Sequence, residues 1–392
     1  MASGRTVSTF TPAMLSCWLL FATVPFWIET VGLYQYLGVE ILIFAIYALA
    51  YNLVLGHAGL PSFGHGAFFG IGAYAFGLAQ FNIAPNLWIC LGVAALAAAL
   101  GGALVAGFIS HRRGIYYALM TIAFGQIFWF VAIKAHSITG GEDGLLKIER
   151  LPVSLALLSF DLKHNVALYY FVLLVFMVVS LLLWRLVHSP FGRIVKAIKQ
   201  NETRARFVGY DVWRYKAATL IASAGLSGLA GGLFSMAQAS AFPDVMSLHY
   251  SGYVVMMTLV GGGLISFWGP VIGAVVFFLA RDVIGALTTG WMLWFGLLFV
   301  ALVLFKPEGI AGMFAGLANR KDRPAVAASR KMVSTTSEHW LCFKKTCWTC
   351  SISSNPMTRT RGRILIVRTH CRCARQSKLK QIAERFLPRT AM

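Results

Sequence analysis

Long apolar stretches separated by short polar gaps recur along the chain up to about residue 315. An α-helix needs about 20 apolar residues to cross the ~30 Å hydrocarbon core of a bilayer. The pattern therefore predicts an all-α polytopic transmembrane bundle of about ten spans, with eight as the lower alternative, because two of the candidates are short and each could be re-entrant. The candidates are 12–30, 38–56, 66–81 (short), 85–109, 115–135, 166–187, 217–238, 251–264 (short), 269–288 and 291–305.

The distribution of basic residues between these spans predicts their orientation. Cytoplasmic loops of membrane proteins carry an excess of Lys and Arg. Such residues occur at positions 112–113 and again within 185–216, where eight of them accompany only two acidic residues, whereas 136–165 has no such excess. We expect both basic loops to face the cytoplasm, and by parity the N-terminus and the C-terminal end of the membrane body to lie there as well.

Small residues recur at intervals of four within several spans, for example at Gly66 and Gly70 and at Gly228 and Gly232. In lipid, this spacing lets helix backbones approach closely and pack by van der Waals contact. We interpret these four glycines as helix-packing positions.

Composition agrees with a membrane body and limits the meaning of the net charge. The chain is 58% hydrophobic and 12% charged, and its formal net charge is +20. Residues up to 318 carry 17 Lys and Arg against 11 Asp and Glu, a net +6, while the remainder carries 17 against 3, a net +14. Most of the basicity lies outside the membrane body, so it does not indicate a nucleic-acid partner.

The sequence lacks the motifs of several reaction classes. No G-x-x-x-x-G-K-[S/T] stretch and no H-E-x-x-H stretch occur. We expect no cofactor, no metal and no enzymatic activity in this chain, because no acid, base or metal groups cluster and because His57 and His65 lack acidic or cysteine companions. Any ATP hydrolysis would belong to a partner subunit.

Ionisable groups within the predicted spans are few, with Glu40, Arg281 and Asp282 as the main candidates. We expect Glu40 to be interfacial, and Arg281 and Asp282 need not pair because neighbours on a helix point about 100° apart. The scarcity of acidic groups at membrane depth disfavours an ion-coupled carrier.

The second basic loop, 189–216, reads SPFGRIVKAIKQNETRARFVGYDVWRYK. Pro190 and Gly192 end the preceding span. Ile194, Ala197 and Ile198 then recur at helical spacing, which predicts a short amphipathic surface helix with these residues on its apolar face. Asn201 is placed to cap a following turn and Gly209 to end it. Two interpretations stay open: an element that transmits motion from a soluble partner, or a basic helix that only sets topology.

Four blocks carry a resemblance to a known family: NLVLGHAGLPSFGHGAFFGIGAYAFG from Asn52, GIYYALMTIAFGQIFWFVA with TGGEDGL between Gly114 and Leu145, the loop PFGRIVKAIKQNETRARFVGYDVWRYK, and more weakly LVGGGLISFWGPVIGA from Leu259 with KPEGIAG. Over roughly residues 30–315 the chain resembles the permease subunit of the branched-chain amino acid ABC transporters, which take up leucine, isoleucine and valine.

The resemblance implies an ABC importer permease of the bacterial inner membrane. Its partners would be a second related permease, two cytoplasmic ATPases that bind the ATP, a periplasmic substrate-binding protein and membrane lipid. Branched-chain amino acids are the expected cargo, with urea, amides and aromatic acids as alternatives within the family. A secondary carrier or channel without ATPases, and a membrane-embedded enzyme, are the competing classes.

Two motifs transfer residue by residue from the family. The loop would be the element that docks on the ATPase, and the matching residues are Phe191, Gly192, Arg193, Ala197, Ile198, Asn201, Glu202, Ala205 and Gly209. The TGGEDGL stretch matches an extracytoplasmic motif comprising Gly140, Gly141, Glu142, Asp143 and Gly144. Its glycines predict a tight turn, and its two acidic residues would face a binding protein or solvent.

The chain departs from the family after residue 316. We divide it into a permease domain at 1–316 and a tail at 317–392 that is basic, contains five of the seven cysteines, and has no sustained helical or strand period. The pairs Cys347–Cys350 and Cys371–Cys373 do not match the spacing of a common zinc knuckle. We expect a disordered or non-native extension that has no part in the function.

Overall fold

The computed structural model describes residues 12–300 and 309–312, with gaps at 29–31, 33, 84, 156–157, 163, 289, 291, 295 and 298. The predicted tail at 317–392 lies outside the described residues, and so does much of the candidate span at 291–305. The predictions for the tail and for the tenth span therefore stay predictions.

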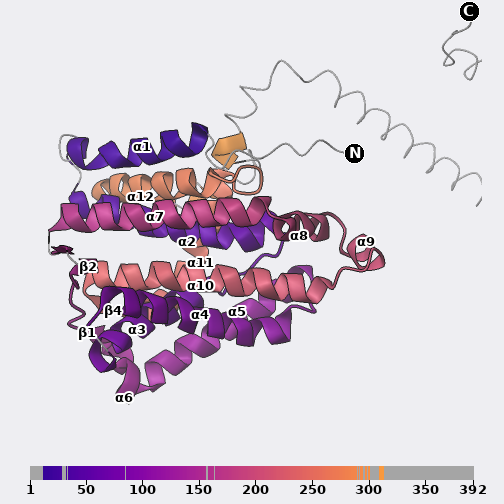
Figure 1. Ribbon diagram of the computed structural model, residues 1–392, viewed down its shortest axis with the longest axis horizontal. Helices are drawn as coiled ribbons and strands as arrows, with labels where there is room; N and C mark the ends of the chain where they lie inside the picture. The colour runs from indigo at the N-terminus through magenta and orange to yellow at the C-terminus, as the bar shows by residue number, and fades with distance from the viewer. Residues whose placement is uncertain are drawn as a thin grey trace, which may run out of the picture. The chain divides into compact units, whose positions relative to one another are not determined.

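Helices dominate the described part of the chain (Figure 1). The α-helices are α1 (Pro12–Trp27), α2 (Gln35–Asn52), α3 (His65–Asn82), α4 (Leu87–Ile109), α5 (Gly114–Lys134), α6 (His136–Thr139), α7 (Asn165–His188), α8 (Pro190–Gln200), α9 (Glu202–Phe207), α10 (Val212–Gln238), α11 (Leu248–Gly261) and α12 (Gly269–Leu287). A π-helical turn, η1 (Leu53–His57), continues α2, and two 3₁₀ turns are η2 (Gly141–Asp143) and η3 (Pro243–Met246).

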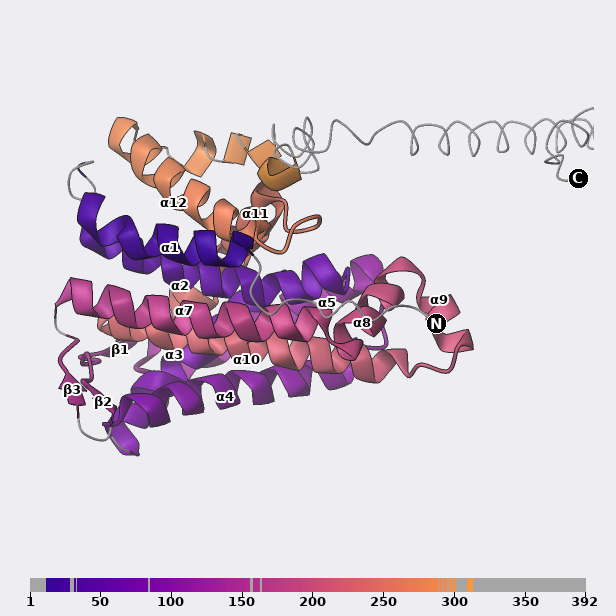
Figure 2. The same cartoon turned by 45° about the horizontal axis from the view of Figure 1, so that its top comes forward.

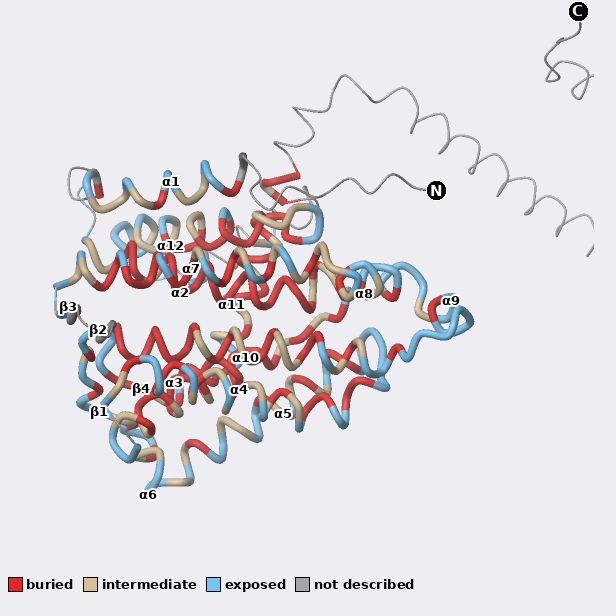
Figure 3. The backbone as a smooth tube through the Cα atoms, viewed as in Figure 1, coloured by how far each residue is buried: buried red, intermediate tan, exposed pale blue. Residues whose placement is uncertain are grey.

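The core of the bundle is built around α2 and α10. Within its most apolar window α2 is 94% buried, whereas the corresponding window of α5 is 22% buried. Helix α10 packs against α3 and α4 on one side and against α2 on the other, and α2 in turn contacts α7, α11 and α12. Figures 2 and 3 show this arrangement, with the buried backbone concentrated in the middle helices. An outer helix such as α5 leaves its apolar side chains for lipid.

Six of the described helices are long and apolar enough to cross a membrane: α2 with η1, α4, α5, α7, α10 and α12. Helix α11 has 14 residues and α1 has 16, so both are short for a full crossing. The structure is that of an all-α polytopic membrane protein. The number of spans, eight to ten, and the sides on which the termini lie stay predictions.

Glycines permit the closest helix crossings. A Cβ at Gly72 of α3 would overlap the carbonyl oxygen of Gly228 of α10, and a Cβ at Gly228 would overlap the Cβ of Ala98 of α4. Helix α10 can therefore approach α3 and α4 at backbone distance.

The other predicted packing glycines differ in how closely they are packed. A Cβ at Gly70 would overlap the Met246 side chain, and one at Gly66 would lie 2.8 Å from Ser251 Oγ. Gly232 is less constrained, since its nearest neighbour would be Ala94 Cβ at 3.0 Å.

Short strands, which the sequence pattern did not predict, close the end of the bundle opposite α8 and α9 (Figure 1). Strand β1 (Leu145–Leu146) pairs antiparallel with β4 (Ser240–Ala241), and β2 (Val153–Leu155) pairs antiparallel with β3 (Leu158–Phe160). Two or three residues are too few to establish an alternating pattern, so hydrophobic periodicity could not detect them.

Candidate functional site

The second basic loop folds as two helices and a reversal, as the sequence predicted. The Ser189 hydroxyl accepts a hydrogen bond from the Gly192 N–H at 3.4 Å where α8 begins, and Asn201 Oδ1 accepts from the Arg204 N–H at 2.9 Å where α9 begins. Gly209 has φ of +96°, in the region that favours glycine, and reverses the chain toward α10. These caps account for the helix, break and return.

The buried face of α8 differs in part from the predicted one. Gly192, Val195 and Ile198 are buried, whereas Ala197, which we placed on the apolar face, is exposed. A Cβ at Gly192 would overlap the Val187 carbonyl oxygen, so α8 turns sharply off the end of α7. Gly192, Val195 and Ile198 pack toward the bundle, whereas Ala197 and Arg193, one turn apart, are exposed.

A small apolar core joins the two loop helices to the bundle. It consists of Ile198 from α8, Ala205 from α9 and Val212 from α10, all buried. Phe191, half-buried, stacks at 5.7 Å from the ring of Tyr215. The loop is therefore anchored to α10 by packing.

Glu202 connects the loop to the first basic loop. Its carboxylate accepts from Arg113 Nε at 2.6 Å and from Lys216 Nζ at 2.7 Å, with Arg206 Nη2 farther away at 3.5 Å. Lys216 also donates to the carbonyl oxygen of Arg112 at 3.2 Å, and its side chain is only 3% exposed. The two basic loops therefore lie at one end of the bundle, which we call the basic end and which Figure 1 shows beside α8 and α9.

Lys199 links α8 to the end of α2. Its Nζ donates to the carbonyl oxygen of Gly56 at 2.6 Å, and a Cβ at Gly59 would lie 2.8 Å from Lys199 Cγ. Gly56 belongs to η1, where the π-helical turn leaves carbonyl groups without the usual helical partner. Partial burial, together with the charge of Lys196, lowers the pKa of Lys199 below its usual value. Sequence reasoning assigned no role to Lys199 or Lys216, because their partners are distant in sequence.

The TGGEDGL motif lies at the opposite end and forms the predicted tight turn. Gly140, Gly141 and Gly144 all have positive φ, between +67° and +76°. Glu142 and Asp143 are exposed. The motif and the basic loop are thus at opposite ends of the bundle.

A cavity of about 420 Å³ lies beside this turn. Its lining includes the carboxylates of Glu142 and Asp244 and the aromatic rings of Trp129, Phe242 and Tyr250. Acidic groups next to apolar walls suit a ligand with both a cationic and an apolar part.

Buried polar contacts tie α2, α3 and α10 together at His65. Ser223 Oγ donates to the carbonyl oxygen of Ala50 at 2.6 Å, so its lone pair must accept the N–H of His65 Nε2 at 2.8 Å. His65 Nδ1 then accepts from the hydroxyl of Ser62 at 2.9 Å. Both ring nitrogens are thus occupied in a neutral imidazole, and no group of three or more metal-binding side chains lies within the described residues.

An ion pair joins two of the ionisable positions identified within the predicted spans. Arg281 of α12 makes a bidentate contact with Glu40 of α2, with Nη1–Oε1 at 3.1 Å and Nη2–Oε2 at 3.0 Å. Arg281 also pairs with its neighbour, Nε to Asp282 Oδ1 at 3.3 Å, a contact that the sequence left open. The arginine fork is long enough to reach around the helix and serve both carboxylates.

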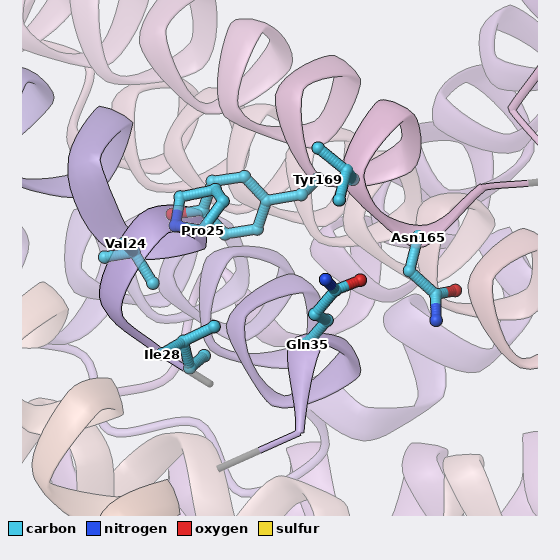
Figure 4. A pocket seen from close by; sticks show the side chains of 7 residues that line it. Val24, Pro25, Ile28, Gln35, Asn165 and Tyr169 are labelled. Atoms are coloured by element: carbon cyan, nitrogen blue, oxygen red, sulfur yellow. The ribbon is translucent and has the colours of Figure 1, made fainter. Parts of the chain in front are cut away.

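A small crevice between three helices is too small to hold a solute (Figure 4). It measures about 10 Å³ and lies where Pro25 of α1, Gln35 of α2 and Asn165 of α7 meet. That volume is close to the minimum for one water molecule, so we exclude this crevice as a binding site.

Comparison with known proteins places this architecture in a family. The family model for the permease component of branched-chain amino acid transport systems matches residues 34–306. The high-affinity branched-chain amino acid transport system permease protein LivM of Escherichia coli is 30% identical over 292 residues, which cover 69% of this chain and 68% of that protein. LivM of Salmonella typhimurium is 29% identical over the same shares.

A probable branched-chain amino acid transport permease protein LivM of Methanocaldococcus jannaschii is 25% identical over 56% of this chain and 72% of that protein. No solved structure matches the chain significantly. The matched region extends from α2 to just beyond α12 and includes both basic loops. This chain therefore belongs to the family of permease components of branched-chain amino acid transport systems.

Proposed function

We propose that this chain is a membrane permease subunit of an ATP-binding cassette importer for branched-chain amino acids. ATP hydrolysis by separate cytoplasmic ATPases would drive it, and the basic loop would receive the force. The observation that carries the proposal is the attachment of this exposed loop to the bundle at several points, since an element that transmits motion must be both accessible to a partner and rigidly connected to what it moves.

Three connections support transmission through the loop. The ion pairs of Glu202 with Arg113 and Lys216 join α9 to α5 and α10. The Lys199 contact with Gly56 joins α8 to α2. A force on the outer surface of α8 and α9 would therefore act on three membrane helices at once, as a coupling element requires.

The outer surface of the loop is suitable for docking. Arg193 of α8 and Arg204 of α9 are exposed, and Figure 3 shows the loop as the most exposed part of the basic end. Arg193 has no ion pair within the described residues, so its charge is available to an acidic partner surface. Excess positive charge in these loops also supports a cytoplasmic location, where the ATPases would be.

The cavity beside the TGGEDGL turn supports the proposed cargo. A branched-chain amino acid has an ammonium group, an apolar side chain and a carboxylate. Glu142 and Asp244 suit the ammonium group, the aromatic rings suit the side chain, and the Gln238 amide in the same lining can donate to the carboxylate. The cavity lies at the end where a periplasmic binding protein would release its ligand.

The competing classes have less support. An ion-coupled carrier needs an acidic group that can exchange its ion, whereas Glu40 is held by the bidentate contact with Arg281. No group of three or more His, Cys, Asp or Glu side chains that could hold a metal ion lies within the described residues, so nothing there favours a metal-dependent enzyme. We therefore retain the importer permease as the best-supported function.

The decisive experiment measures leucine uptake and ATPase activity with the complete set of subunits reconstituted in proteoliposomes. Arg193→Glu should lower both, and it should reduce co-purification of the ATPases, because it reverses the charge at the docking surface. Lys134→Glu, an equal reversal at an exposed position of the opposite end, serves as the control. Uptake that stays unchanged in Arg193→Glu and continues without ATP would favour the carrier and contradict the proposal.

A further inference from the structure

A second cavity, of about 880 Å³, lies at the basic end. Its walls come from the end of α7, from α8, from η1 and from the segment joining α11 to α12. The volume falls within the range of known ligand sites, roughly 300–1,000 Å³. The proposed docking function uses the outer side of α8 and does not involve this space, which we call the basic cavity.

The ionisable side chains that line the basic cavity are all those of basic residues. Lys196 and Lys199 come from α8, His188 from the end of α7 and His57 from η1, and none of the lining residues is acidic. Partial burial lowers the pKa of Lys199, and the nearby charge of Lys196 lowers it further. An anion between them would relieve this repulsion, because each ammonium group gains an opposite charge.

Aromatic side chains form another part of the wall of this cavity. Trp184 and Trp268 line the cavity, and the buried indole N–H of each has no acceptor within the described residues. The Phe267 ring makes edge-to-face contacts with both, 5.2 Å from the Trp184 ring and 5.3 Å from the Trp268 ring. The aromatic rings thus form a packed wall, and the two lysines are the charged donors that line the cavity for an anion.

The chemistry of the rim indicates where the anion comes from. Leu264 and Ile265 belong to the same wall and are 41% and 57% exposed. Tryptophan is enriched where membrane helices meet the headgroup layer, and basic pockets between helices on the cytoplasmic side bind lipid headgroups. An apolar rim beside a cationic interior fits a molecule with a phosphate group and acyl chains.

We propose that the basic cavity binds the phosphate headgroup of an anionic phospholipid. Lys196 and Lys199 neutralise the phosphate, Trp184 and Trp268 form the aromatic wall beside it, and the acyl chains extend over Leu264 and Ile265. The site adjoins the contact between Lys199 and Gly56, so the bound lipid stiffens the connection between α8 and η1.

The test measures lipid retention by the purified full chain in detergent, with native mass spectrometry during titration by phosphatidylglycerol or phosphatidylcholine. The wild-type chain should retain phosphatidylglycerol in preference to phosphatidylcholine. The double variant Lys196→Gln/Lys199→Gln should bind phosphatidylglycerol about thirtyfold more weakly, which is about fivefold for each basic residue at the membrane surface.

Two further variants separate the site from general effects. Lys196→Gln alone leaves the contact between Lys199 and Gly56 intact and should weaken binding about fivefold, which guards against misfolding of the double variant. Arg214→Gln removes the same charge from a side chain that is 77% exposed at the same end but outside the cavity, and it should bind as the wild type does.

Three results would overturn the assignment. Equal retention by the double variant and the wild type would exclude the lysines, and an equal loss in Arg214→Gln would indicate general charge attraction. If soluble glycerol phosphate displaced phosphatidylglycerol at concentrations similar to those of the lipid, the ligand would be a free phosphate compound. None of these results depends on uptake, so the proposal can fail while the importer function stands.

Discussion

Lys216 and Glu202 form an ion pair of 2.7 Å in which the lysine side chain is 3% exposed and the glutamate side chain 13% exposed. The pair connects the beginning of α10 with the first residue of α9. Arg113 adds a second cation to the same carboxylate at 2.6 Å. One carboxylate therefore holds together three segments of the basic end, and its removal would leave two cations facing each other.

Glu202→Gln should destabilise the protein by about 3 kcal/mol, because removing one partner of a buried pair leaves the other charge uncompensated. The measurement is thermal unfolding of the purified chain in detergent. Glu202→Gln/Lys216→Met should recover part of the loss by removing both charges. Asp211→Asn breaks an exposed pair with Arg214 and should change stability by less than about 1 kcal/mol. Equal effects of Glu202→Gln and Asp211→Asn would show that the buried pair is not structural.

Gly228→Ala should lower the stability of the bundle by about 1–3 kcal/mol, because the added methyl group overlaps Ala98 Cβ and forces α4 and α10 apart. Gly92→Ala is the matched control, since it adds the same methyl group to α4 at a position with nothing within 4 Å. Thermal unfolding of both variants, side by side, checks the prediction. A Gly228→Ala protein as stable as Gly92→Ala would mean that the crossing is looser than the structure indicates.

Ser223→Ala should cost about 1–3 kcal/mol, because it leaves the His65 Nε2–H buried without an acceptor, while the Ala50 carbonyl keeps the Leu53 N–H. Ser137→Ala changes an exposed serine on α6 and should have little effect. Unfolding temperature is again the primary measurement. A ¹⁵N spectrum of the imidazole provides a second check, since the wild type should show a neutral ring protonated at Nε2, and protonation at Nδ1 would contradict the assigned network.

Arg281→Gln should destabilise the contact between α2 and α12 by about 2 kcal/mol, between the values for exposed and buried pairs, since Glu40 and Asp282 lose their shared cation. The exchange Glu40→Arg/Arg281→Glu should restore part of the loss. Stability of the three proteins by thermal unfolding measures both effects. Failure of the exchange to improve on Arg281→Gln would indicate that packing of the arginine over the Phe278 ring, at 4.6 Å, matters more than the ion pair.

Several features of the site were accessible from local sequence signals. The cap at Asn201 and the reversal at Gly209 depend on residues within a few positions of one another, and the structure confirms them. The cap at Ser189 is equally local but was not predicted. The Gly262 turn, with φ of +83°, and Pro270 in the first turn of α12 belong to the same class. Ala197 was assigned to the wrong face, because it lies about 100° around the helix from Ile198, outside the buried stripe that contains Val195 and Ile198.

The sequence by itself determined the membrane character of this protein, the positions of most helices and the form of the basic loop, since these depend on local hydrophobicity, spacing and caps. Only the tertiary structure decided the pairings of Glu202 with Lys216 and Arg113, of Lys199 with Gly56, and of His65 with Ser223. Lys199 and Gly56 are 143 positions apart in the sequence, and His65 and Ser223 are 158 positions apart. A periodic pattern defines which face of a helix is apolar, but the partner of that face is set by the packing of the whole bundle.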